Sequence, residues 1–265
     1  MKHYSFLLFS ILLLINTPIQ AHDFWLEANP YLIKPNQQTG LSINVGENMK
    51  GETLPNIPAW YRAFDVITAD GLKPVEGNMG AEPAGHFSHQ THGIYAIGYL
   101  SNKDTVQLDA EKFTKYLKNQ GLEKIIKQRK TLGEADQTAN EIYSRNVKAL
   151  VKVGDKNIVN FYQYDFKHPL NITPLQDPYQ LKQGENLKVK ITFRQQPAVD
   201  LLVKAEIKDN TTYQYQVRTN TQGIATIPLS HKGIWLIKAV EMERLTNKDE
   251  KWESYWGSLT FELAL

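Results

Sequence analysis

The sequence predicts a mainly β fold with two β-sandwich domains, of immunoglobulin-like or transthyretin-like type, and a helical insert. Short runs that alternate apolar and polar residues recur in both halves of the chain, and turn residues separate them. One stretch between the halves carries apolar residues at helical spacing instead. With 42% hydrophobic and 11% aromatic residues, the chain has enough apolar side chains to fill such cores.

The first domain is expected at residues 22–169. Residues 41–45 and 95–99 alternate with the period of two that places every second side chain on one face of a strand. A helical insert is expected at residues 109–153, because Asp109 is a typical N-cap residue and apolar side chains follow it at spacings of three and four. These apolar positions are Phe113, Tyr116, Leu117, Leu122, Ile125, Ile126, Ile142, Tyr143, Val147, Leu150 and Val151.

The second domain is expected at residues 170–265 and contains strands only. Apolar runs follow one another at a spacing of about ten residues, which is typical of a β-sandwich. The runs lie at residues 187–193, 199–207, 213–217, 224–227, 234–240 and 252–263. The last run carries Trp252, Tyr255 and Trp256, for which we favour core packing over a sugar-stacking surface.

Residues 1–21 have the layout of a secretory signal peptide. Lys2 precedes an apolar run at residues 6–15, and the small residue Ala21 follows. This run is about ten residues long, whereas a membrane-spanning helix needs roughly 20. We expect cleavage after Ala21, a mature chain that begins at His22, a periplasmic location and no membrane span in the mature chain; an uncleaved anchor is the alternative.

Composition excludes several classes of function. The chain has no cysteine, which rules out disulfides, thiolate zinc sites, iron–sulfur clusters and a cysteine nucleophile. It has 30 Lys and Arg residues against 28 Asp and Glu residues, a net charge of +2 that is too balanced to indicate nucleic-acid binding. The hydrolase, nucleotide-binding and zinc-protease motifs are absent from the sequence, so we predict no catalysed reaction.

His22 is the first candidate metal ligand. After cleavage it offers an imidazole and a free α-amine from one position, and the amine has a reference pKa of about 7.7–8, so that its proton is lost easily to a metal. Such a nitrogen chelate suits nickel, cobalt, copper or zinc. Asp23 and Glu27 lie close in the sequence and offer oxygen ligands. The alternative is a solvated histidine without a role.

A histidine stands at every third position of one segment: His86, His89 and His92. Residues three apart in a strand point to opposite faces, so the three converge only if the segment turns, which Gly85 and Gly93 allow. Short tracts rich in histidine are a compositional indication of metal binding. The alternative is a polar exposed loop.

Residues 46–52 form a further candidate loop, with two carboxylates and a thioether. Glu47 and Glu52 are hard ligands and Met49 is a soft one, so this mixture names no metal. A flexible hairpin tip explains the segment equally well.

Residues 21–27, Ala-His-Asp-Phe-Trp-Leu-Glu, together with five further segments, resemble one known family over nearly the whole mature chain. The further segments are residues 97–102, 108–117, 121–122, 143–150 and 252–261. The family is the one catalogued as domain of unknown function 4198 (DUF4198). This resemblance implies a bacterial periplasmic protein of a kind often labelled a nickel- or cobalt-uptake component.

Two residues take a role from this resemblance, and a third departs from it. His22 matches the family's histidine after the signal, and Arg145 matches an arginine that we expect to be a buried structural anchor. The resemblance implies a histidine after Gly46, where this chain has Glu47. The metal ligands expected are therefore His22, with one or more of His86, His89, His92 and Glu47.

The function expected from these observations is periplasmic binding of a divalent transition metal, nickel or cobalt first, with copper or zinc as alternatives. Its partners are the metal ion and a membrane metal-uptake transporter. One alternative is a copper-dependent oxidative enzyme built on the same N-terminal histidine. The other is a cell-envelope interaction module that binds no metal.

Overall fold

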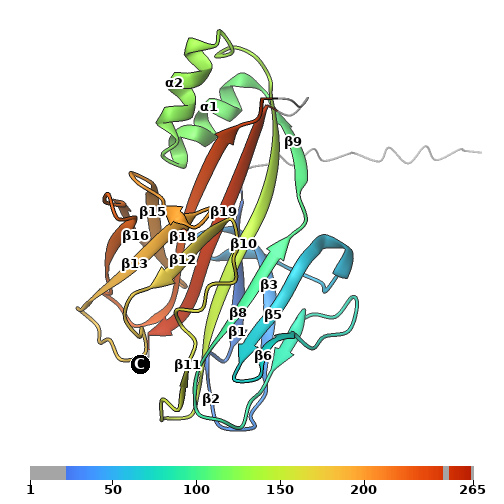
Figure 1. Cartoon of the computed structure of the whole chain (residues 1–265), viewed down its shortest axis with the longest axis vertical. Helices are drawn as coiled ribbons and strands as arrows, with labels where there is room; N and C mark the ends of the chain where they lie inside the picture. Colours follow the sequence, from blue (N-terminus) through green and yellow to red (C-terminus); the bar gives the residue numbers. More distant parts are fainter. Residues whose placement is uncertain (1–21, 247–250, 264–265) are drawn as a thin grey trace, which may run out of the picture.

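The computed structural model describes residues 22–246 and 251–263, and the predicted signal peptide lies outside them. The prediction of a mainly β fold is confirmed: strands form most of the described chain, and two short helices lie at one end (Figure 1). Within the described residues, no helix combines the length and the apolar character needed to cross a membrane.

A long central sheet crosses the molecule. Within the described residues it has 11 strands, in the order β16-β15-β18-β19-β10-β8-β5-β6, with β2 and β9 paired to β10 and β11 paired to β8. Its strands are β2 (Leu32–Ile33), β5 (Tyr61–Thr68), β6 (Gly71–Pro74), β8 (Gly93–Ser101), β9 (Asp104–Leu108), β10 (Ala139–Val153), β11 (Val159–Asn160), β15 (Leu202–Ile207), β16 (Asn210–Arg218), β18 (Gly233–Arg244) and β19 (Trp252–Leu263).

Two smaller sheets pack against this long sheet. One contains β1 (Asp23–Asn29), β3 (Thr39–Glu47), β4 (Lys50–Leu54) and β7 (Gly85–Phe87), and a single 3-10 turn (Pro58–Trp60) precedes β5. The other contains β12 (Leu170–Pro174), β13 (Asn186–Phe193), β14 (Gln196–Pro197) and β17 (Ile224–Pro228). Each makes a two-layer sandwich with part of the long sheet.

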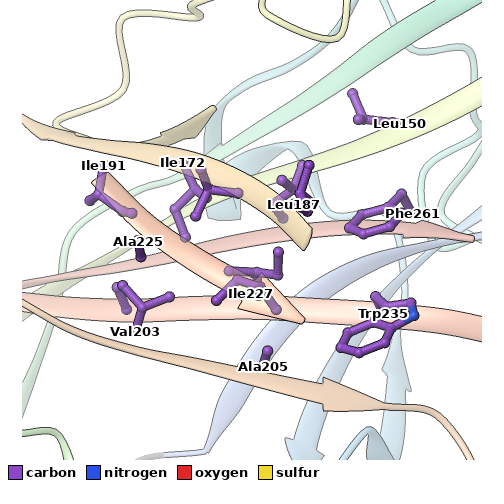
Figure 2. Packing of buried hydrophobic residues seen from close by; sticks show 14 of the residues in the cluster. Leu150, Ile172, Leu187, Ile191, Val203, Ala205, Ala225, Ile227, Trp235 and Phe261 are labelled. Carbon is purple, nitrogen blue, oxygen red and sulfur yellow. The ribbon is translucent and has the colours of Figure 1, made fainter. Parts of the chain in front are cut away.

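Each sandwich has its own apolar core. In the first, Leu26 and Leu41 pack with Tyr95 and Val151. In the second, side chains of β12, β13 and β17 meet those of β15, β18 and β19, as Figure 2 shows for Ile172, Ile191, Ile227, Val203, Trp235 and Phe261. Strands from both sides of the predicted domain boundary at residue 169 share the long sheet, and the division into two domains stays a prediction.

The helices α1 (Ala110–Asn119) and α2 (Glu123–Thr131) form the start of the predicted insert. The Asp109 side chain caps α1 by accepting a hydrogen bond from the Lys112 backbone N–H at 2.8 Å. The α1 side chains Phe113 and Tyr116 pack on Trp252 and Trp256 of β19. Tyr255 points to the opposite side, into the core of the second sandwich. All three aromatic residues are buried, as expected for core packing, but Trp252 and Trp256 belong to the core beneath the helices and not to that of the second sandwich.

The predicted helical insert at residues 109–153 is wrong in its last third, because residues 139–153 form strand β10. This strand is central in the long sheet and pairs with β8, β9 and β19. Both of its faces are covered, so apolar residues occupy both and the alternation typical of a half-buried strand is lost. Spacings such as Val147 to Leu150 and Val151 then imitate a helix.

Lys148 is a cation buried within β10, with 2% of its surface exposed. Its Nζ donates hydrogen bonds to the carbonyl oxygens of Tyr164 at 2.8 Å and Ile172 at 3.3 Å. Burial lowers the pKa of Lys148 from its ordinary value of 10.5 to about 7. The folded protein therefore loses this proton at a lower pH than the unfolded chain does.

We expect the free energy of unfolding to rise with pH above about 7, by up to about 1.4 kcal/mol per pH unit from Lys148, because the unfolded chain then binds more protons. The contribution is complete near the unfolded pKa of about 10 and absent below pH 7. Lys148→Met should reduce the slope, and Lys188→Met, at an exposed position of β13, should not. Urea unfolding from pH 6.5 to 9 measures both; equal slopes in the two variants would contradict the assignment.

Candidate functional site

His22 directly precedes β1 and is held through its main chain. Its carbonyl oxygen accepts a hydrogen bond from Nη1 of Arg145 at 3.1 Å. The side chain of His22 is partly exposed. The start of the mature chain that we predict is therefore fixed at its backbone while its imidazole stays accessible.

Arg145 reaches His22 from an aromatic cage. Its guanidinium carbon lies 4.6 Å from the centre of the Trp256 ring, 5.0 Å from that of Tyr143 and 5.7 Å from that of Phe24. Ring faces attract a cation, which offsets part of the cost of burial. Burial lowers the pKa of Arg145, but an arginine remains charged at any ordinary pH. This geometry fits the anchoring role that we expected for the residue.

Strands β1 and β3 pair antiparallel, and their pairing ends at Asp23 and Gly46. Glu47 is the residue of β3 that follows Gly46. His22 likewise stands one residue beyond this pair, so both residues follow directly from the end of the β1–β3 pairing. Glu47 pairs in turn with Lys50, which leaves Asn48 and Met49 as a two-residue turn. Both turn residues have positive φ, 53° and 55°, as the preferred hairpin turns require.

Met49 is not available as a soft ligand. It is 3% exposed and packs against Trp25 and Leu236. The hairpin tip is consequently docked on the molecule through this side chain, and Glu47 remains the exposed carboxylate on the β3 side of the turn.

Asp23 already has a charged partner, which reduces its value as a metal ligand. Asp23 and Glu206 both form ion pairs with the Nζ of Lys238, Glu206 at 2.5 Å. Burial raises the pKa of Glu206, and the ammonium group of Lys238 opposes that rise. Glu27, the other nearby acid, forms an ion pair with Lys208.

A cavity of about 710 Å³ opens beside this start of the chain. Helix α1 forms one wall, β15, β16 and β18 form another, and the β3–β4 turn contributes Glu47 and Asn48. Asp23 lies in its lining as well. The lining is mostly polar and charged, and it places Glu47 at the same opening as the first residues of β1.

His86, His89 and His92 lie elsewhere. His86 pairs with Gly40, seven residues along β3 from Glu47, which is a separation of roughly 20 Å along the strand. The ring of His89 contacts Tyr95, and its Nδ1 accepts a hydrogen bond from the Thr91 N–H at 3.0 Å.

The third histidine of this segment is His92, and its Nδ1 lies 3.2 Å from Oδ1 of the exposed Asp155. Of these histidines, His86 lies near the far end of the small sheet from His22, and the structure does not bring the three next to His22. Throughout residues 22–246 and 251–263, no three side chains of His, Asp or Glu are placed to hold one metal ion.

The family model for domain of unknown function 4198 matches residues 19–243, most of the chain. The chain belongs to the DUF4198 family. No curated protein matches its sequence. The resemblance inferred from the N-terminal segment and its companions is thereby confirmed at the level of the family.

Solved structures similar to this DUF4198 chain are distant in sequence. The D0-D1 domain of intimin is 12% identical, with 91% of this chain and 97% of that chain covered and a TM-score of 0.21. Salmonella alpha-2-macroglobulin reacted with methylamine is 10% identical, with 90% of this chain and 15% of that chain covered and a TM-score of 0.21. A mutant of the same Salmonella protein is 9% identical, with the same two coverages and a TM-score of 0.20.

Sequence reasoning missed a buried carboxyl group behind the cavity. Glu141 of β10 is 2% exposed and accepts hydrogen bonds from the hydroxyl groups of Tyr116, at 3.1 Å, and Ser254. Trp256 donates to Ser254 at 3.0 Å, which extends the network toward Arg145. Burial raises the pKa of Glu141 from 4.5 to about 7. Its position within a segment that imitates a helix concealed this role.

Glu141→Gln tests whether this group is protonated in the fold. The folded protein keeps the proton up to about pH 7 and the unfolded chain loses it near 4.5, so the free energy of unfolding falls as pH rises between those values. The amide carries no charge and its oxygen can accept both hydroxyl hydrogen bonds. Its NH2 group takes the place of Oε2, which has no hydrogen-bond partner among the described residues, and this cost is the same at every pH. We therefore expect the stability of the variant relative to the natural protein to be about 1–3 kcal/mol higher at pH 8 than at pH 4.5.

Guanidinium unfolding at the two pH values measures this difference. Glu76→Gln, at an exposed position, is the matched control and should show no such gain. A variant that is destabilised equally at both pH values would show that Glu141 is ionised in the fold.

Proposed function

We propose that this protein binds a divalent transition metal at the start of its mature chain and supports metal uptake in the periplasm. The observation that carries the proposal is the position of His22, partly exposed, held by Arg145 at its carbonyl, and, like Glu47, one residue beyond the end of the β1–β3 pairing. The proposal assumes export cleavage after Ala21, which creates the free α-amine.

The donor set suits a borderline metal ion. The amine and imidazole of His22 supply two nitrogen atoms from one residue, and the Glu47 carboxylate supplies an oxygen atom. Asp23 and Glu27 are engaged by lysines, so Glu47 is the carboxylate best placed to help. Three protein donors leave further coordination positions to water, which suits a carrier that must release its cargo.

Nickel and cobalt are proposed as cargo because of the uptake label attached to resembling proteins, not because of geometry. Nitrogen sites of this kind bind copper most tightly in the ordinary stability order, and zinc also accepts them. A membrane transporter is the proposed partner, since a soluble carrier has to deliver its ion. No reaction is part of the proposal.

The metal site is tested by calorimetric titration of nickel, cobalt, copper and zinc into mature protein that begins at His22. We expect one ion per chain. One additional N-terminal alanine should weaken binding at least tenfold, because the α-amine then no longer belongs to His22. Glu47→Gln should weaken it by a smaller factor, whereas Glu52→Gln, on the outer strand of the hairpin, should leave it unchanged.

Equal binding by the protein that begins at His22 and the alanine-extended protein, or binding by neither, would contradict the terminal chelate. Loss of binding when His86, His89 and His92 are replaced together by alanine would move the site to the other end of the sheet. Reductant-dependent peroxide formation by the copper-loaded protein would favour the oxidative alternative. A melting temperature unchanged by all four metals would favour the interaction module.

A further inference from the structure

The cavity beside α1 has a surplus of positive charge. Its lining includes four carboxylates and six cations, which gives a formal excess of two positive charges. The cations come from α1 and from the three strands of the facing wall. They are Lys112, Lys115, Lys118, Lys204, Arg218 and Lys238.

Three of these cations are already neutralised by partners. Lys238 forms ion pairs with two carboxylates, as described above. Arg218 pairs with Glu123 at 2.7 Å, and Lys112 pairs with Asp109 at 2.9 Å. Among the described residues, Lys115, Lys118 and Lys204 form no direct ion pair, although Asp23 and Glu206, the partners of Lys238, also act on Lys204 at longer range.

Lys204 is the most unusual of the three. It is partly buried in β15, and within the described residues its amine makes no hydrogen bond or ion pair. The register places it directly opposite Lys238 on the neighbouring strand. Like charges in directly opposite positions of an antiparallel pair destabilise a sheet. Burial lowers the pKa of Lys204 and the charge of Lys238 lowers it further, whereas the carboxylates of Asp23 and Glu206 oppose that shift.

The other lining residues suit a polar ligand of small size. Lys115 and Lys118 are exposed on α1, on the wall across from Lys204. The amide side chains of Asn119, Gln214 and Gln216 line the same space and can bind hydroxyl or carboxylate oxygens. A volume of about 710 Å³ falls in the usual range for small-molecule sites.

We propose that this cavity binds a small organic anion that carries at least two carboxylate or phosphate groups. One anionic group contacts Lys204 on the sheet, and a second lies toward Lys115 and Lys118 of α1. The ligand adds a direct anionic contact to Lys204, which in the protein alone meets only the longer-range charges of Asp23 and Glu206. The site adjoins the proposed metal ligands, because Glu47 also lines the cavity, but the groups proposed to contact the anion are different ones.

The test is calorimetric titration of EDTA-treated mature protein with citrate, malate and pyrophosphate, with glucose as a neutral compound. We expect at least one polyanion to bind, more weakly at high salt. The two carboxylate probes and the phosphate probe distinguish the sources of charge. Lys204→Gln should weaken binding about tenfold or more, since one charge-assisted hydrogen bond is lost.

Two controls separate binding from folding. Lys188→Gln removes an exposed lysine of β13, far from the cavity lining, and should leave binding unchanged. A melting curve of the ligand-free Lys204→Gln variant checks that the variant is folded. The double variant Lys115→Gln, Lys118→Gln should weaken binding severalfold.

The inference is overturned if none of the polyanions binds at millimolar concentration, if glucose binds equally well, or if Lys204→Gln binds like Lys188→Gln. His22→Ala should retain the polyanion site, because metal is absent from the titration. Its failure to bind polyanion would assign the anion to the chain start rather than to the cavity. Failure of the metal titration alone leaves this inference standing.

Discussion

The parallel pairing of β10 with β19 is the constraint on which the rest of the structure depends. It joins residues from Glu141 to Ala149 with residues from Trp252 to Thr260, more than one hundred positions apart in the sequence. Through this pairing the strands of both sandwiches enter one sheet, with β8 and β5 on one side and β18 and β15 on the other (Figure 1). The same register sets Arg145 beside Trp256, which is the first wall of the cage that holds the start of β1.

Much of the fold follows from local sequence patterns, and β10 shows where those patterns fail. Helix α1 after Asp109 was predictable, because an N-cap residue followed by apolar residues at helical spacing is a local feature. Strand β10 was not, since its neighbours on both faces come from distant segments and remove the period of two. Local spacing cannot tell a strand covered on both faces from a helix when the apolar run is short.

In the candidate site, individual residues could be predicted from the sequence but their arrangement in space could not. His22 and Glu47 were identifiable separately, from a signal layout and from a departure within a resembling segment. Their common position at the end of the β1–β3 pairing depends on the antiparallel register of these strands, which no local feature specifies. The position of His86 relative to His22 depends on pairing as well, since β7 joins β3 at the end remote from His22. The position of Lys204 opposite Lys238 likewise exists only after two strands have paired.

Ion pairs within the protein explain why a metal ion and an anion can bind at adjacent sites through different side chains. Lys238 engages both Asp23 and Glu206, so Glu47 is the carboxylate left near His22, whereas Lys204 forms no direct ion pair among the described residues. A cation bound at His22 would add positive charge at the opening of the cavity, and an anion within it would then be held more firmly. By thermodynamic linkage, the anion would strengthen metal binding by the same factor. With water and salt between the two sites, that factor should be small and should shrink as ionic strength rises, because screening acts over about 10 Å at 0.1 M salt.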